Sequence, residues 1–576
     1  MKKTIYQLVL FSVLCCFFST PYAFSAEVYY FGNGGGEKSE QNKSYPLSQR
    51  FKDLMDLSSD RPMSERSGRI SGSVLTQAEY DKVSGNKSKS FLDKGWDYLT
   101  EMDLNMQEKL WSDYNMEGQL MMRKTDNPRI EPRRDVRIKE YSLKVSNPDN
   151  LFLAGDFYGE LSPLTMGSSL EGLTAEVKPN ETLAMKYIAA RQDGPDEAAS
   201  TFQRNVFGTK FDTFWFKDSE TVSNSRLGFQ AVTVQDDSSD PDRTSSFTDL
   251  RNSVLSVDGD LAFVRYFSLN YELARSMYLA DEDSATVKDQ SYGNALRVTP
   301  QLKFGKTTVR HLYGYTQPQF YADVGSASPD KVQHQTTVDH RFSKRASVSL
   351  LHNYYWDHLT GSSRTKRTIN DEKSVTMNFL PLASRETFRV RLNTGYNLRN
   401  SDDVANTLES STFTSGFGLY DRFKETDVGF SYQYRAFSNR HDKSASDYFN
   451  RLGMTFAREY YVVARRLYLS LNPGMDFRRI KTDDNYDVNA SLGFSGQYDI
   501  SKNFLTRFGH NLMDSNNAKA NADYTNNRSF MELDWTLGKD RDRHIVLRGD
   551  INRYMHEDGT LNYKEHQLIL KCVINF

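Results

Sequence analysis

Cysteine and long apolar runs are scarce in this chain of 576 residues. Three cysteines are too few for a disulfide scaffold, a zinc ribbon or a cysteine-ligated cluster. No stretch beyond the N-terminus holds the roughly 18 consecutive apolar residues of a membrane-spanning helix. Neither sign of charge dominates, because 73 Lys and Arg face 75 Asp and Glu, and so we expect no nucleic-acid partner.

Aromatic residues, in contrast, are abundant in an otherwise polar chain. Tyr and Phe number 33 and 36, whereas only 38% of residues are hydrophobic and the mean hydropathy is −0.66. At about 150 residues per domain, the length alone predicts three or four domains. The composition, however, shows no break after about residue 97.

The first 25 residues have the pattern of an export signal. Two lysines precede an apolar stretch from Ile5 to Phe18, and the small residues Ala23 and Ser25 fit a cleavage site before Ala26. We therefore expect export across the inner membrane of a bacterium. Cys572 is then the only cysteine left, so the exported chain has no internal disulfide.

Alternation of apolar and polar residues dominates the rest of the chain. Between residues 386 and 400, Phe388, Val390, Leu392, Thr394, Tyr396 and Leu398 alternate with Arg389, Arg391, Asn393, Gly395, Asn397 and Arg399. Successive side chains of a strand point to opposite faces, so this segment has one apolar and one wet face. The same period recurs over residues 255–263, 267–273, 428–435, 467–478 and 531–537. These segments are predicted strands.

Strand length favours a membrane barrel over a soluble sandwich or propeller, whose strands also alternate. The alternating segments run for 11 to 15 residues, whereas soluble strands usually have about 5–6 and a tilted membrane strand needs about 9–11. Aromatic residues near strand ends, such as Tyr354, Tyr355 and Trp356, fit a girdle at the membrane interface.

Connection lengths and strand number define the expected barrel. Long polar connections, such as 237–250, 281–291 and 318–330, alternate with tight ones, such as 265–266 and 305–306. Outer-membrane barrels have this pattern, with short periplasmic turns and longer outer loops. From residue 98 onward we count 25 strand candidates, and one more around Arg69 to Leu75 would give an even 26.

We therefore predict an all-β, transmembrane antiparallel barrel of about 24–26 strands. The predicted division is a signal at 1–25, an N-terminal periplasmic or plug segment at 26–97 and the barrel at 98–576. Within the N-terminal segment, apolar residues over Leu47 to Leu57 have helical spacing. That segment would plug the lumen, dock a periplasmic partner or remain tethered.

The end of the chain carries the most specific pattern. The residues Leu568, Leu570, Cys572, Ile574 and Phe576 form an apolar series that ends on the last, aromatic residue. An ordinary edge strand ending in Phe is the alternative explanation. At this point the sequence resembles bacterial outer-membrane β-barrel proteins, whose final strand ends in such an aromatic. The resemblance implies an outer-membrane location, contact with its lipid and recognition of this strand by the barrel-assembly machinery.

The stretch from Gly155 to Leu164, followed by Leu170 to Val177, reads as strand, short loop and strand. A strand number near 26 is similar to that of the large barrels that sheathe multihaem cytochromes. Barrels of the decahaem-associated type carry a CxxC near the mature N-terminus, and this chain has none.

The sequence carries little catalytic or metal-binding chemistry. Its ten histidines form no HExxH motif and no close ligand cluster, and CxxCH and G-x-S-x-G are absent. We therefore expect no enzyme activity, no metal and no cofactor. The densest candidate for a hydrolase site is His352, and its neighbours are Tyr354, Tyr355, Trp356, Asp357 and His358. A strand end at the aromatic girdle explains this group more simply.

Charged residues on the predicted wet faces are the candidate lumen lining. They are Arg389, Arg391, Arg399, Arg435, Arg478, Asp476, Glu532 and Asp534. A porin-like channel for solutes or exported polymers is the first functional hypothesis, with these residues tuning selectivity. The second is a structural sleeve around a periplasmic or lumenal protein partner, such as a multihaem cytochrome, and an outer-membrane hydrolase is the third.

Overall fold

The structure is a computed structural model that describes residues 69–576 with short gaps. The gaps are 91, 93, 111–112, 131–135, 194–202, 216–221, 238–248, 264–265, 282–288, 361, 363–365, 402–408, 483–484, 518–521 and 539–541. The predicted signal and the predicted helix at Leu47 to Leu57 lie outside the described residues. Among the described residues, no helix is long and apolar enough to cross a membrane.

The described residues contain 26 strands. The first thirteen are β1 (Arg69–Gly85), β2 (Gly95–Lys109), β3 (Asn115–Thr125), β4 (Arg137–Ser146), β5 (Asn150–Ser162), β6 (Met166–Asn180), β7 (Leu183–Asp193), β8 (Gln203–Trp215), β9 (Val222–Asp237), β10 (Asp249–Phe263), β11 (Phe267–Asp281), β12 (Asp289–Phe304) and β13 (Thr307–Thr316). The other thirteen are β14 (Lys331–Ser343), β15 (Ala346–Asp357), β16 (Thr368–Phe379), β17 (Arg389–Ser401), β18 (Glu409–Phe423), β19 (Thr426–Asn439), β20 (Asp447–Val462), β21 (Arg465–Ile480), β22 (Asp487–Ser501), β23 (Phe504–Asn516), β24 (Tyr524–Leu537), β25 (Arg543–His556) and β26 (Tyr563–Asn575).

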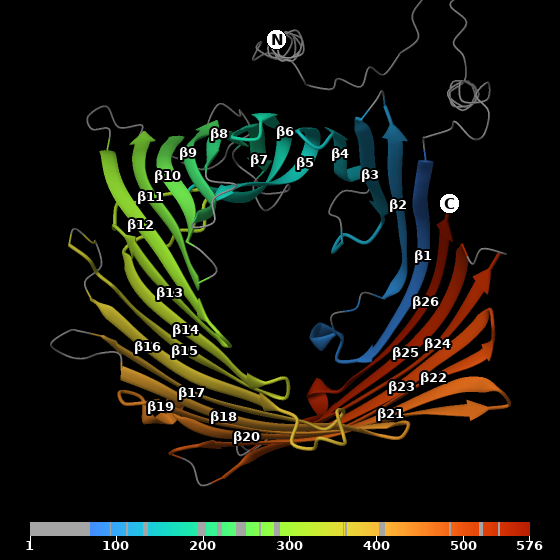
Figure 1. Ribbon diagram of the computed structural model, residues 1–576. Coiled ribbons are helices and arrows are strands. Elements are labelled where there is room, and N and C mark those ends of the chain that lie inside the picture. The colour runs from blue at the N-terminus through green and yellow to red at the C-terminus, as the bar shows by residue number, and fades with distance from the viewer. Residues whose placement is uncertain are drawn as a thin grey trace, which may run out of the picture. The chain divides into compact units, whose positions relative to one another are not determined.

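The sheet closes on itself. Each strand pairs with its neighbours in sequence, and β1 pairs antiparallel with β26 from Ser73↔Asn575 to Gly85↔Tyr563. Figure 1 shows the red C-terminal strand beside the blue first strand. Closure gives backbone polar groups partners within the sheet, as a strand structure in lipid requires. The predicted antiparallel barrel is confirmed, with 26 strands.

The barrel begins earlier in the chain than expected. The additional strand around Arg69 to Leu75 exists as β1, so barrel strands begin inside the range 26–97 rather than at residue 98. From Thr76 onward, the outward face of β1 carries Thr76, Ala78, Tyr80 and Lys82. Beyond Val74 this face has no large aliphatic side chain, and the apolar alternation that marks the other strands is therefore weak over most of β1.

Long and short connections alternate between the two ends of the barrel. Residues 317–330 join β13 to β14, whereas only Gly305 and Lys306 join β12 to β13. We refer to the end with the longer connections as the long-loop end. Large apolar side chains such as Leu255 (63% exposed) and Met531 (56%) point outward, as a lipid-facing surface requires.

Candidate functional site

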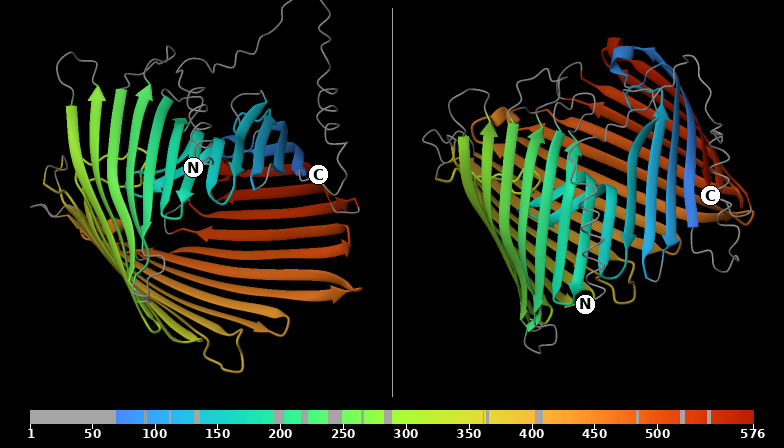
Figure 2. Two further views of the ribbon diagram at one scale, coloured as in Figure 1. Left: turned by 45° about the horizontal axis from the view of Figure 1, so that its top comes forward. Right: turned by 90° about the horizontal axis from the view of Figure 1, so that it is seen from above.

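A hairpin leaves the wall and turns into the barrel. We call residues 156–170, the turn-side part of β5 and β6, the inner hairpin. β4 and β5 pair only from Ser142↔Gly155 to Ser146↔Leu151, and β6 and β7 pair from Glu171↔Arg191 onward. Beyond those pairs, β5 and β6 pair with each other. Figures 1 and 2 show this hairpin crossing the inner side of the neighbouring strands. The predicted strand, short loop and strand are confirmed.

A glycine marks the point of departure. Gly155 has a φ of +109°, and a Cβ added there would lie 2.1 Å from the carbonyl oxygen of Tyr141. Only glycine adopts this backbone conformation without strain. Directly after it, the carboxylate of Asp156 accepts a hydrogen bond of 2.7 Å from the backbone N–H of Tyr141. A side chain thereby satisfies a donor of β4 at the point where the ladder with β5 ends.

The inner hairpin packs an apolar face against the inner wall. Met166 of the hairpin and Val206 of β8 are fully buried. Their cluster consists of Leu161, Met166, Leu170, Ile188, Val206, Val232, Val234 and Val324. Each such side chain stabilises the contact by about 1.5–3 kcal/mol when it leaves water. The opposite face of the hairpin is open, and Tyr158 is 63% exposed.

The connection from β13 to β14 covers the same region. Phe320 packs with Leu164 of the hairpin turn and with Val254, Ala274 and Ala295 of the wall. Backbone hydrogen bonds join the two segments, from Gly167 N–H to the Val324 oxygen (2.7 Å) and from Ser326 N–H to the Pro163 oxygen (3.1 Å). The hairpin and this connection therefore form one body on the inner face of β7–β12. We call the part of the wall beneath this body the covered wall.

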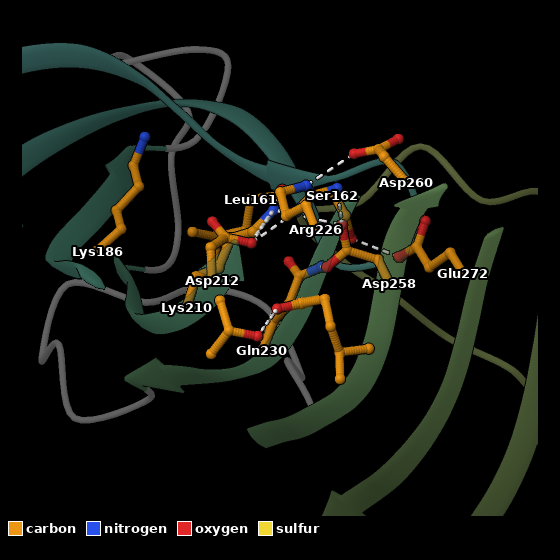
Figure 3. Close-up of polar contacts among 12 residues, drawn as sticks. Leu161, Ser162, Lys186, Lys210, Asp212, Arg226, Gln230, Asp258, Asp260 and Glu272 are labelled. Carbon is orange, nitrogen blue, oxygen red and sulfur yellow. Dashed lines mark hydrogen bonds and ion pairs between the residues drawn. The ribbon is translucent and has the colours of Figure 1, made fainter. Parts of the chain in front are cut away.

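A charged cluster lies in the covered wall, and Figure 3 shows its members. The guanidinium of Arg226 donates to Asp260 (2.7 Å), to Asp212 (2.6 Å) and to Asp258. The Lys210 ammonium donates to the backbone oxygen of Leu161 at 2.9 Å and lies 3.6 Å from Asp258. Asp258 is buried and its partners Arg226 and Lys210 are only 21% and 12% exposed, so their pairing offsets the cost of removing these charges from water.

Two side chains of the hairpin turn, Ser162 and Thr165, connect it to this cluster. The Ser162 hydroxyl donates to Glu272 of β11. The Thr165 hydroxyl donates to the Gln230 oxygen at 3.2 Å, and the Gln230 amide donates to Asp258 at 2.6 Å. With the bond from Lys210 to the Leu161 oxygen, they hold the inner hairpin against the wall. A hydrogen bond to a charged group such as Lys210 is worth about 1.5–3 kcal/mol, and one between neutral groups, such as Thr165 and Gln230, about 0.5–1.5 kcal/mol.

The register places all eight predicted lumen residues on the same face as this cluster. Residues directly opposite each other in a sheet share a face. One row of partners runs unbroken through Glu272, Arg297, Gly314, Gln333, Tyr355, Asn370 and Arg399. The rows through Arg435, Arg478 and Asp476 continue it to Glu532 and Asp534 on β24. Their role in lining a conducting lumen stays a prediction.

Five of the eight enter ion pairs whose partners the sequence analysis missed. Arg435 and Arg478 share Asp447, at 3.0 and 2.9 Å. Asp476 pairs with Arg451 at 2.9 Å. The other two, Glu532 and Asp534, surround Arg507, with Arg548 3.6 Å from Glu532 and His544 3.2 Å from Asp534. Among the described residues, Arg389, Arg391 and Arg399 of β17 enter none of these pairs.

His352 lies on the outward face rather than in the lumen. Its Nε2 is 3.0 Å from Asp371, which also accepts a hydrogen bond from Lys373 at 2.8 Å. On the same face, the rings of Tyr354 and Trp356 lie 5.5 Å apart. This position matches a girdle of aromatic residues near a strand end. In the described part of the chain, no group of three His, Cys, Asp or Glu residues is placed to hold a metal ion.

Solved structures similar to this chain are barrels. The siderophore receptor PirA from Pseudomonas aeruginosa is 12% identical, with a TM-score of 0.42 over 88% of this chain and 80% of that chain. The P pilus usher PapC translocation pore is 8% identical, with a TM-score of 0.35 over 88% and 99%. OccK2 (OpdF) from P. aeruginosa, in complex with glucuronate, is 10% identical, with a TM-score of 0.32 over 57% and 92%. No protein-family model and no curated protein matches the sequence.

Proposed function

We propose that this protein is an outer-membrane channel for hydrophilic solutes, narrowed from inside by the inner hairpin. The observation that carries the proposal is the covered wall. A closed sheet with an apolar outer face and charged groups on its inner face provides a wet path through lipid. The hairpin and residues 317–330 occupy part of that path, held by the contacts of Lys210, Thr165 and Ser162.

The same proposal includes export by the predicted signal and contact with outer-membrane lipid. It also includes insertion by the barrel-assembly machinery, which would recognise the strand from Leu568 to Phe576. The charged residues of β17–β25 would then face the solute. Their arginines and carboxylates make a lumen of mixed charge, which favours hydration over selection for one sign of ion.

A second candidate, a sleeve around a partner protein, is favoured by the strand number. Barrels of 16–18 strands leave an aqueous channel, and barrels of 22 strands hold a plug. With 26 strands, the lumen has room for an occupant besides the inner hairpin. A periplasmic or lumenal protein partner would be that occupant.

Conductance across a planar bilayer tests the two candidates. The purified full-length protein should give a steady open current. Replacing residues 160–167 by two glycines removes the hairpin turn and should raise that current. The matched control replaces Lys443–Ala445, a turn between β19 and β20, by two glycines and should leave it unchanged.

A cross-link between the hairpin and the wall tests whether the closed hairpin is the conducting state of the wild type. Thr165→Cys and Gln230→Cys, in a Cys572→Ser background and joined by a short bifunctional thiol reagent, would tie the turn to the wall, since the Thr165 hydroxyl and the Gln230 side-chain oxygen are 3.2 Å apart. The cross-linked protein should conduct like the wild type. Equal currents in the shortened and wild-type proteins would contradict the constriction, and a current that requires removal of a copurified protein would support the sleeve.

A further inference from the structure

A groove lies on the outer surface where the barrel closes, far from the inner hairpin in sequence. It has a volume of about 460 Å³ and crosses β24, β25, β26 and β1. Outward side chains that line it are Tyr80, Met531, Ile551, His566 and Leu568. Gly549 forms its floor, and a Cβ added there would meet no atom within 4 Å. The missing side chain at Gly549 therefore leaves an apolar depression in the lipid-facing surface.

Cations gather at the edge of this groove toward the long-loop end. On the outward face, Gly549 pairs with Leu568, Ile551 with His566, and Arg553 with Lys564. On the other side of β26, Lys82 of β1 pairs with His566. The side chains of Arg553 and Lys564 are thus direct cross-strand neighbours of like charge, which is unfavourable unless an anion lies between them.

Acidic residues of the same strands point to the other face. Glu565 accepts hydrogen bonds from Ser90 and Asn552, and Asp550 pairs with Arg548 at 2.7 Å. In the part of the chain that the structure describes, no ion pair includes Lys82, Arg553 or Lys564. These three cations therefore face the outer surface together without a carboxylate.

We propose that this surface binds a lipid whose phosphate headgroup has a net negative charge, the phosphate between Lys82, Arg553 and Lys564 and an acyl chain in the groove over Gly549. Lysine and arginine are the side chains that bind phosphate in proteins. Arg553 lies near the end of β25, and Gly549 lies four residues deeper, or about 13 Å at the rise of a strand. The cations thus stand at headgroup depth and the groove at acyl depth. A second copy of the chain would bring its own cations to this face and be repelled.

Native mass spectrometry of the full-length protein, stripped of lipid in a phosphate-free detergent, tests the site. Titrated with phosphatidylglycerol, the wild type should retain one lipid at least tenfold more tightly than phosphatidylcholine, whose headgroup has no net charge. The double variant Arg553→Gln, Lys564→Gln should lose this preference. Gly549→Leu, which fills the groove, should weaken binding of phosphatidylglycerol tenfold or more.

The control is Arg275→Gln, which removes an exposed outward arginine that lies over Tyr292 and should leave lipid binding unchanged. If Gly549→Leu does not fold, Gly549→Ala still fills part of the groove without a clash and should weaken binding. Equal retention in all variants would overturn the proposal. So would tight binding of inorganic phosphate that Gly549→Leu does not affect, or a dimer that disappears in the double variant.

Discussion

The same type of ion pair is exposed to water to different degrees in two regions of the barrel's inner face. In the covered wall, Arg226 is 21% exposed and its partner Asp258 is 8% exposed. In the open wall, the inner face of β17–β25, Arg451 is 56% exposed and its partner Asp476 is 23% exposed. Both are arginine–aspartate contacts between inward-facing residues, and they differ in whether a second layer of chain excludes water.

This difference in exposure decides how much a charge contributes to stability in the open wall and in the covered wall. A pair screened by water contributes about 0–1 kcal/mol. A buried pair adds little net stability, yet removing one partner costs about 3–5 kcal/mol because a charge is left without compensation. The covered wall therefore depends on its charges to keep the hairpin in place. Charges of the open wall can be replaced with little loss of stability, so they can set the ion selectivity of the lumen instead.

The largest expected effect comes from removing the central cation of the covered wall. Arg226→Met leaves Asp212, Asp258 and Asp260 with Lys210 as the nearest cation, at a cost of about 3–5 kcal/mol. The inner hairpin should open, and its amides should exchange hydrogen roughly 100-fold faster or more, since 1.4 kcal/mol is tenfold. Hydrogen exchange followed by mass spectrometry over residues 156–170 measures this.

Arg226→Lys is the control for that variant, because it keeps a positive charge and loses the fork of hydrogen bonds. Its exchange rate should lie between those of the wild type and Arg226→Met. Unchanged exchange in Arg226→Met would mean that apolar packing alone holds the hairpin.

The apolar contact of the hairpin gives the next effect. Met166 is 0% exposed, and Met166→Ala should destabilise the closed hairpin by about 2–5 kcal/mol through lost burial and a cavity. Exchange over residues 156–170 should again accelerate. Tyr158→Ala, on the open face of the same hairpin, is the matched control and should change it little. Equal effects of both substitutions would show that the hairpin has no dry face.

The departure point from the wall is the third test. Gly155→Ala requires a residue with a Cβ at a φ of +109° and close to the Tyr141 oxygen. Such backbone strain costs of order 1–3 kcal/mol. The melting temperature of the barrel should fall, as measured by its heat-dependent migration on a gel. Gly314→Ala, where the nearest atom to the added Cβ is 3.9 Å away, should leave it unchanged, and equal melting of both would contradict the argument.

The alternation of residues made the barrel predictable, since the segment at 386–400 forms β17 with the expected faces. The inner hairpin was predicted as two strands, but not its turn into the lumen. Val206, Val232 and Val234 could have indicated this turn. They are apolar residues on the inward face of their strands, where polar residues are expected in a water-filled barrel. Apolar residues on both faces of a strand are typical of a sheet covered on both sides.

The ion pairs of the open wall could not be predicted for another reason. Period two assigns Asp476 to a face, but its partner Arg451 follows from the register between β20 and β21. A shift of one residue changes every cross-strand pair. Register depends on turn geometry and on pairing along the whole strand, which a single sequence pattern does not contain.

The smallest effect belongs to the open wall and completes the comparison with Arg226→Met. Arg451→Met removes the partner of Asp476 at a cost of about 1 kcal/mol or less, since water replaces the lost contact. Exchange over residues 156–170 and the melting temperature should stay unchanged. The ion selectivity of the current should instead shift toward cations, because an inward-facing positive charge is lost while the carboxylate remains. A loss of stability as large as that of Arg226→Met would mean that water does not reach the open wall, and that an occupant of the lumen covers it as the hairpin covers β7–β12.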